Sequence, residues 1–129
     1  VKYGKTSLHE IKRMLLKQAK KSVCQLEFFQ SNHEGAIIDF LQTESAINAD
    51  GVLINPGALV RYGYSLRQAL IDLGKPVVEI HMSDINRTGV NKKVNILDDV
   101  RIDQIVGLKV KSYELGLRKL VSYLNKVKF

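Results

Sequence analysis

Glu79 and His81 are the two residues of this sequence whose types and spacing best suit catalysis. They end the apolar segment Val77–His81, which has the length and β-branched content of a strand. Side chains two apart on a strand point to the same face, so the Glu79 carboxylate can orient and charge the His81 imidazole. A histidine held in this way is a candidate general acid. A lone His–Glu pair is more often a hydrogen-bonded pair in a core, so both interpretations stay open.

Two further polar clusters follow predicted strands. Asn55 comes directly before Pro56-Gly57-Ala58, a tight turn whose backbone N–H groups can hold an anion or a water, or can simply reverse the chain. Residues 30–35 read Gln-Ser-Asn-His-Glu-Gly, and their Ser and Asn can instead cap the next helix. Open α/β sheets bind ligands outside the carboxyl ends of their strands, so the three clusters together predict one site at one sheet edge.

The elements that must position these clusters alternate between helix and strand. Ser7 with Glu10 three residues later forms a capping-box pattern, which predicts the first helix start. Hydrophobic periodicity predicts helices at residues 7–20, 34–45, 64–73 and 112–126, and strands at 23–29, 51–54, 77–81 and 104–108. This alternation indicates a parallel, right-handed, doubly wound α/β sheet. Residues 85–100 are expected to form a loop, because they are rich in Asn, Lys and Asp.

Composition narrows the function classes. With 129 residues and 45% hydrophobic content, the chain is expected to form a single domain over residues 1–129. The single Cys24 excludes a disulfide framework and suits a reducing compartment, and no apolar run approaches a membrane span. The sequence therefore predicts a cytoplasmic protein without a membrane partner.

The net charge of +7 needs separate treatment, because a basic protein can bind nucleic acid. Here the basic residues lie along the polar faces of the first and last predicted helices, which is typical of solvated surface. No zinc spacing, glycine-rich phosphate loop or basic strand with interleaved aromatics is present. The charge pattern favours a small anionic substrate over nucleic acid.

Taken in order, these segments resemble one family, the type II 3-dehydroquinate dehydratases, which have a flavodoxin-like fold. The resemblance spans nearly the whole chain. It is carried by Tyr3-Gly4, by residues 29–35, by Ile54-Asn55-Pro56-Gly57-Ala58, by residues 66–70, by residues 76–83, and by residues 105–108 and 113–117. It implies a shikimate-pathway lyase that uses no cofactor and no metal and that forms trimers assembled into a dodecamer.

The resemblance also implies a mechanism, an anti elimination of water from 3-dehydroquinate through an enolate. Tyr3 would be the base, and His81 would protonate the departing hydroxyl while Glu79 holds its ring. Asn55, with backbone near Pro56 and Ala58, would fix the water that stabilises the enolate oxygen. The remaining substrate contacts implied by the resemblance come from Ala58, Arg61, Met82, Ser83 and Lys92.

Several positions differ from the family pattern. Arg61 stands where the family has a histidine, Gln68 replaces an acid, and Asp84 replaces an asparagine. Lys92 replaces a substrate-binding arginine, and this change keeps the charge but loses the bidentate fork of the guanidinium. The family's first strand and lid arginine would precede Val1, so this sequence is expected to be a fragment without that strand. Two function classes follow, the dehydratase and a non-catalytic relative that binds a small anion or a protein partner.

Overall fold

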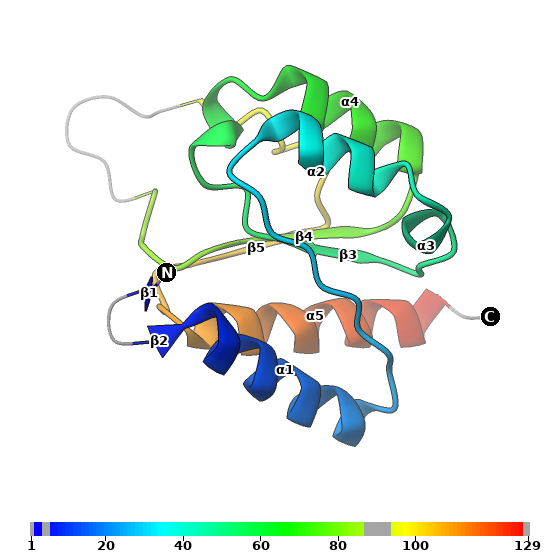
Figure 1. Cartoon of the computed structure of the whole chain (residues 1–129), viewed down its shortest axis with the longest axis vertical. Coiled ribbons are helices and arrows are strands. Elements are labelled where there is room, and N and C mark those ends of the chain that lie inside the picture. The colour runs from blue at the N-terminus through cyan, green and yellow to red at the C-terminus, as the bar shows by residue number, and fades with distance from the viewer. Residues whose placement is uncertain (1, 4–5, 87–93, 128–129) are drawn as a thin grey trace.

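A three-stranded parallel sheet lies between two layers of helices in the computed structural model, which describes residues 2–3, 6–86 and 94–127. The sheet consists of β3 (Val52–Ile54), β4 (Val77–His81) and β5 (Asp103–Val106), in the order β3-β4-β5. Helices α2 (Glu34–Leu41) and α4 (Tyr64–Leu73) cover one face, and α1 (Leu8–Ser22) and α5 (Lys111–Val127) cover the other (Figure 1). The predicted flavodoxin-like α/β class is confirmed.

Four short elements were not predicted. Strands β1 (Lys2–Tyr3) and β2 (Thr6–Ser7) form a small antiparallel pair before α1. A one-turn helix, α3 (Glu44–Ile47), follows α2, and the 3₁₀ helix η1 (Gly57–Arg61) follows β3. Such short elements carry little hydrophobic periodicity, so sequence patterns do not indicate them.

The long helices begin and end where their capping residues predict. The Ser7 hydroxyl accepts a hydrogen bond from the Glu10 backbone N–H at 3.2 Å, which satisfies one of the free N–H groups at the start of α1. Gly74 ends α4 with a left-handed φ of 70°, a conformation that glycine adopts without steric cost. The expected helix 34–45 divides into α2 and α3 because the Thr43 hydroxyl caps a new turn by accepting from the Ala46 N–H.

The two faces of the sheet have separate hydrophobic cores. Val77 and Leu97 are fully buried against α2 and α4, whereas Val78 and Ile80 pack against α5. Central strand β4 is buried at every residue, as expected for a parallel strand covered on both faces. Within the described ranges, no helix is long and apolar enough to cross a membrane.

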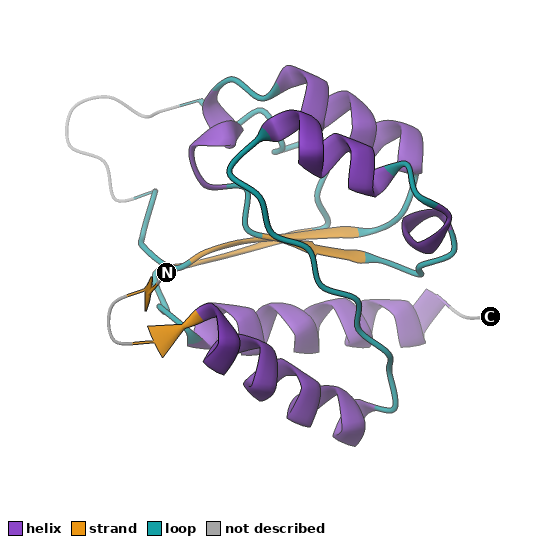
Figure 2. Cartoon of the chain, in the orientation of Figure 1, coloured by secondary structure: helices purple, strands orange, loops and turns teal. Residues whose placement is uncertain are grey.

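The predicted strand at residues 23–29 is wrong. Val23 ends α1 with a left-handed φ of 53°, and the following residues join no strand that the structure describes. Figure 2 shows this segment as a loop that runs from the α1 layer to the α2 layer. Its side chains still alternate between exposed and partly buried, and Leu26 and Phe28 pack near α1 and α5. The Phe29 ring stacks on the Phe40 ring with their centroids 4.5 Å apart. A strand-like pattern needs a partner to form a ladder, and no described strand pairs with it.

The loop expected at residues 85–100 is partly corrected. Ile96 and Leu97 are buried in the core beside α4, and the Ile96 N–H donates to the Val60 carbonyl at 2.8 Å. Residues 94–101 therefore form an ordered segment that covers one face of β4. Residues 87–93 lie outside the described part of the chain. The last predicted strand ends early, at Val106, because Gly107 turns the chain with a φ of 77°.

Helix α5 lies so close to the sheet that Gly116 has no room for a side chain. A Cβ atom there would lie 2.7 Å from Ile80 Cγ2 and 2.8 Å from Leu53 Cδ1. We expect Gly116→Ala to lower the free energy of unfolding by about 1–3 kcal/mol, because the overlap outweighs the gain in helix propensity. Urea denaturation measures this change.

Gly35 provides the matched control, since it also lies in a helix but a Cβ there meets nothing within 4 Å. Gly35→Ala should be neutral or stabilising by up to about 1 kcal/mol. Equal stability losses in the two variants would contradict the close packing of α5.

Candidate functional site

The carboxyl ends of the three parallel strands share one edge of the sheet. His81 is the last residue of β4, and Asn55 directly follows β3, whose Ile54 is paired with Glu79. In Figure 1 these ends point to the left, and β1, which contains Tyr3, lies at the same end of the molecule. The fold therefore brings the backbones of the predicted site residues to a common end.

Glu79 and His81 are in direct contact, as their spacing predicts. The His81 Nε2 atom lies 2.5 Å from the Glu79 Oε2 atom. Both side chains are almost completely removed from solvent, with exposed fractions of 4% for His81 and 0% for Glu79. A contact this short in a buried place fixes the orientation of the imidazole ring.

The Glu79 carboxylate has three other polar neighbours. Its Oε2 atom accepts from Asn95 Nδ2 at 2.8 Å and from Gln104 Nε2 at 3.0 Å, and its Oε1 atom lies 3.1 Å from Arg101 Nη1. Burial raises the pKa of Glu79, but the hydrogen bonds from His81, Asn95 and Gln104 and the charge of Arg101 outweigh it, so the pKa is lower than that of an ordinary glutamate. The carboxylate is thus held in its charged form.

Sequence patterns do not indicate these neighbours of Glu79. Gln104 lies directly across from Glu79 in the β4–β5 register, a pairing that sequence spacing does not reveal. Asn95 lies in the segment expected to form a loop, residues 85–100, and Arg101 directly follows that segment. Alternation along β4 explains the arrangement, because Val78 and Ile80 face α5 and Glu79 therefore faces the opposite side.

Asn55 makes its contacts toward α5. Its Nδ2 atom donates to the Tyr113 hydroxyl at 3.0 Å, and its Oδ1 atom accepts from the Gly57 N–H at 3.3 Å. Asn55 therefore sits at the same edge as His81 but leans toward the other face of the sheet. The structure brings Glu79 and His81 into contact and places Asn55 on the neighbouring strand end.

The turn after β5 supports the residues that follow His81. The Lys109 N–H donates to the Met82 carbonyl at 2.9 Å, and the Gly107 N–H donates to the Ser83 carbonyl at 3.2 Å. The fully buried Ser112 hydroxyl donates to the His81 carbonyl at 3.2 Å, a contact that the sequence did not indicate. The Met82 and Ser83 backbone is fixed at the strand end, while the Ser83 side chain stays exposed.

The structure describes the other predicted site residues to different extents. Arg61 lies at the end of η1 and donates from Nη1 to the Val94 carbonyl at 2.8 Å, and Ala58 is exposed in the same helix. Tyr3 is described by its backbone alone, which pairs with Thr6 in the β1–β2 hairpin. Lys92 lies outside the described residues. Asp84 is exposed and accepts a hydrogen bond from the Asn86 N–H at 3.1 Å.

The cluster at residues 30–35 has structural roles. Glu34 Oε2 accepts from the Leu66 N–H at 3.0 Å and so caps the first turn of α4, and Ser31 Oγ accepts from the His33 N–H. The expected cap on the next helix by Ser or Asn is not formed, because His33 is the N-cap of α2 and no side chain caps that helix; Glu34 caps α4 instead.

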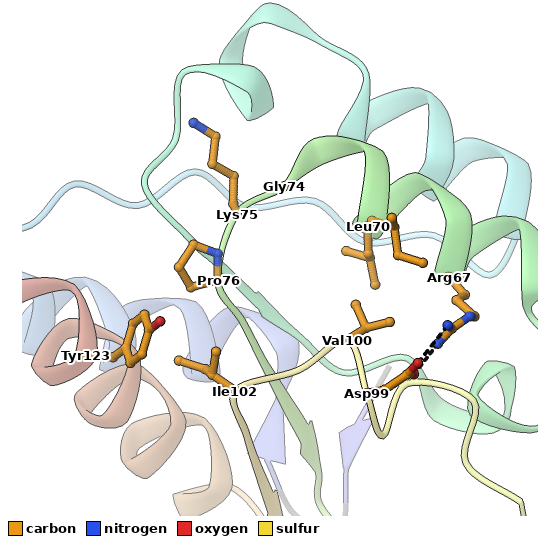
Figure 3. A pocket seen from close by; sticks show the side chains of 10 residues that line it. Arg67, Leu70, Gly74, Lys75, Pro76, Asp99, Val100, Ile102 and Tyr123 are labelled. Carbon is orange, nitrogen blue, oxygen red and sulfur yellow. Dashed lines mark hydrogen bonds and ion pairs between the residues drawn. The ribbon is translucent and has the colours of Figure 1, made fainter. Parts of the chain in front are cut away.

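A hollow of about 390 Å³ lies at the other end of the sheet, near the residues that precede β4 and β5. Figure 3 shows Pro76, Ile102 and Tyr123 along one side of it and the ion pair of Arg67 with Asp99 along the other. It is separate from the strand ends that carry Asn55 and His81. In the part of the chain that the structure describes, no group of three or more His, Cys, Asp or Glu side chains could hold a metal ion.

Comparisons with known proteins agree with this fold. The family model "Dehydroquinase class II" matches residues 1–121. The chain is 40% identical over 124 residues to 3-dehydroquinate dehydratase of Dictyoglomus turgidum, covering 96% of this chain and 85% of that protein. It is 42% identical over 119 residues to the same enzyme of Roseiflexus castenholzii, covering 92% and 75%.

Solved structures give the same assignment. The type II dehydroquinase of Butyrivibrio crossotus superposes with a TM-score of 0.82 and 35% identity, over 92% of this chain and 82% of that one. The type II dehydroquinase of Propionibacterium acnes gives a TM-score of 0.81 at 26% identity, over 93% and 82%. By sequence match and by architecture, this chain belongs to the class II dehydroquinase family.

Proposed function

We propose that this protein is a lyase that dehydrates 3-dehydroquinate to 3-dehydroshikimate in the shikimate pathway of aromatic amino-acid biosynthesis. The observation that carries the proposal is the buried contact of His81 with Glu79 at the carboxyl edge of the sheet, in a chain of the class II dehydroquinase family. The elimination is anti and passes through an enolate. The net charge of +7 favours the approach of the anionic substrate.

His81 is the proposed general acid. Because Nε2 is occupied by Glu79, the proton for the departing hydroxyl comes from Nδ1. After the transfer, the ring is neutral and keeps its Nε2–H bonded to the carboxylate. Glu79 thus stabilises the charged ring before the step and fixes its tautomer afterwards.

Tyr3 is the proposed base that removes the proton next to the ketone. A phenol has an ordinary pKa near 10, so this role requires a cation beside its oxygen at neutral pH. Asn55 and the turn that contains Ala58 fix the water that stabilises the enolate oxygen, and the Asn55 amide is already oriented by Tyr113. The proposed contacts to the rest of the substrate come from Arg61, Met82, Ser83 and Lys92.

The wider biology is proposed from the same family. The enzyme works without a cofactor or metal, in the cytoplasm, as a homo-oligomer of trimers assembled into a dodecamer. It has no nucleic-acid partner.

One observation favours a second function, in which the protein binds an anion and does not catalyse a reaction. The His81 side chain is only 4% exposed, which suits a structural histidine as well as a catalytic one. Arg61, held by its hydrogen bond to the Val94 carbonyl, would then bind the anion with its remaining guanidinium N–H groups.

An assay with 3-dehydroquinate separates the two functions. The dehydratase produces a conjugated enone, whose absorbance is followed over a range of pH values, while calorimetry measures binding independently. Enone formation supports the enzyme. Binding without product formation would replace it with the anion-binding relative, and the absence of both would reject 3-dehydroquinate as the ligand.

The first prediction about roles concerns Tyr3. We expect Tyr3→Phe to abolish turnover while substrate binding is largely kept, because only the phenolic oxygen is lost. Steady-state kinetics and calorimetry measure the two effects separately. Rates like those of the unmodified protein would reject Tyr3 as the base.

The second concerns His81. Loss of a general acid slows turnover by about 10²-fold or more, so His81→Ala should lower kcat by at least that factor. His9→Ala is the control, because His9 is exposed on α1, which covers the face of the sheet opposite to Glu79. If His81→Ala lowers only the melting temperature and leaves kcat unchanged, His81 is structural.

A further inference from the structure

The two carboxylate oxygens of Glu79 have different polar neighbours. Oε2 has three close neighbours, His81, Asn95 and Gln104, at 2.5–3.0 Å. Oε1 is buried and has no hydrogen-bond partner within the described residues. A buried carboxylate oxygen without a donor is costly unless a charge compensates it, so Oε1 needs a cation nearby.

Arg101 supplies that cation. Its Nη1 atom lies 3.1 Å from Glu79 Oε1 and 2.6 Å from Asp98 Oδ1, and it has a hydrogen-bond geometry to neither. The Arg101 side chain is only 16% exposed. The guanidinium therefore acts on Glu79 through its charge, at short range and largely shielded from water.

We propose that Arg101 is a positioning residue for the reaction, which holds Oε1 of Glu79 so that Oε2 stays directed at His81. This inference rests on the proposed function. The ion-pair contacts of Arg101 are to Glu79 and Asp98 and not to His81, so Arg101 acts on His81 only through Glu79. Arg101 belongs to the segment at residues 94–101. The position of that segment therefore affects His81, the proposed general acid.

The charges around Glu79 explain why the effect is specific. Glu79 faces His81 on its own strand, β4, and the neutral Gln104 on β5. The segment at residues 94–101 adds Arg101, which lies between Glu79 and Asp98. From α4, the Arg67 guanidinium is turned to Asp99 and the Ile96 carbonyl. Without Arg101, Glu79 and Asp98 would be two carboxylates with only His81 to balance them. Glu79 would then take up a proton more readily and lose its hold on the ring.

The experiment compares Arg101→Met with the unmodified protein. Carboxyl ¹³C resonances, with Glu79 assigned through Glu79→Gln, follow the ionisation of Glu79 directly. We expect Arg101→Met to raise the pKa of Glu79 and to lower kcat on the acid side of the pH profile by on the order of tenfold, with KM little changed. Arg101→Lys should restore part of both effects because it restores the charge.

Acid unfolding provides a second measurement. The pKa of Glu79 is lowered by folding, so Glu79 stabilises the protein above its unfolded-state pKa and this contribution is lost as the pH falls through the folded-state pKa. Since the folded-state pKa rises in Arg101→Met, its acid unfolding should begin at a higher pH. Arg101→Gln, which keeps a polar side chain without the charge, gives the same test if the Met variant does not fold.

Arg118→Met is the matched control, because Arg118 pairs with Glu114 at 3.5 Å on the exposed face of α5. It should move neither the Glu79 resonance nor the pH profile. An unchanged Glu79 titration in a folded Arg101→Met or Arg101→Gln protein would overturn the proposal. The titration needs no substrate, so it tests Arg101 even if the unmodified protein shows no turnover and the proposed function fails.

Discussion

The rest of the site depends on one constraint, the burial of the Glu79 carboxylate in the centre of the sheet. Glu79 has no exposed surface, and an isolated carboxylate in such a place would be protonated rather than charged. The chain keeps it charged with donors from three regions, namely β4 itself, β5 and the segment at residues 94–101. Each of these regions must be in place before His81 has its carboxylate partner.

This constraint explains features of the fold that would otherwise look unrelated. Helix α5 must lie close to the sheet for the Ser112 hydroxyl to reach the His81 carbonyl, and the absence of a side chain at Gly116 permits that approach. The burial of Ile96 and Leu97 holds the segment at residues 94–101 against α4. This segment places Asn95 and Arg101 beside Glu79. Packing on both faces of β4 therefore determines the electrostatics at its end.

The sequence predicted those features that depend on local periodicity. The start of α1 follows from Ser7, and the Glu79–His81 contact follows from the two-residue repeat of a strand. The failures depend on long-range partners. Residues 23–29 have the alternation of a strand, but no described strand pairs with them. Arg101 and Asn95 belong to a polar segment without periodicity, so only the folded chain reveals that they meet Glu79.

The charged groups of the site form a row that runs from the interior to the solvent. His81 contacts Glu79, the other oxygen of Glu79 lies beside Arg101, and Arg101 lies beside Asp98, whose side chain is 66% exposed. From Glu79 through Arg101 to Asp98 the sign of the charge alternates, so the buried charge of Glu79 is compensated by Arg101. Only the last member, Asp98, is hydrated by bulk water. The buried Glu79 carboxylate stays charged at this sheet edge because it is compensated by Arg101 as well as by its hydrogen-bond donors.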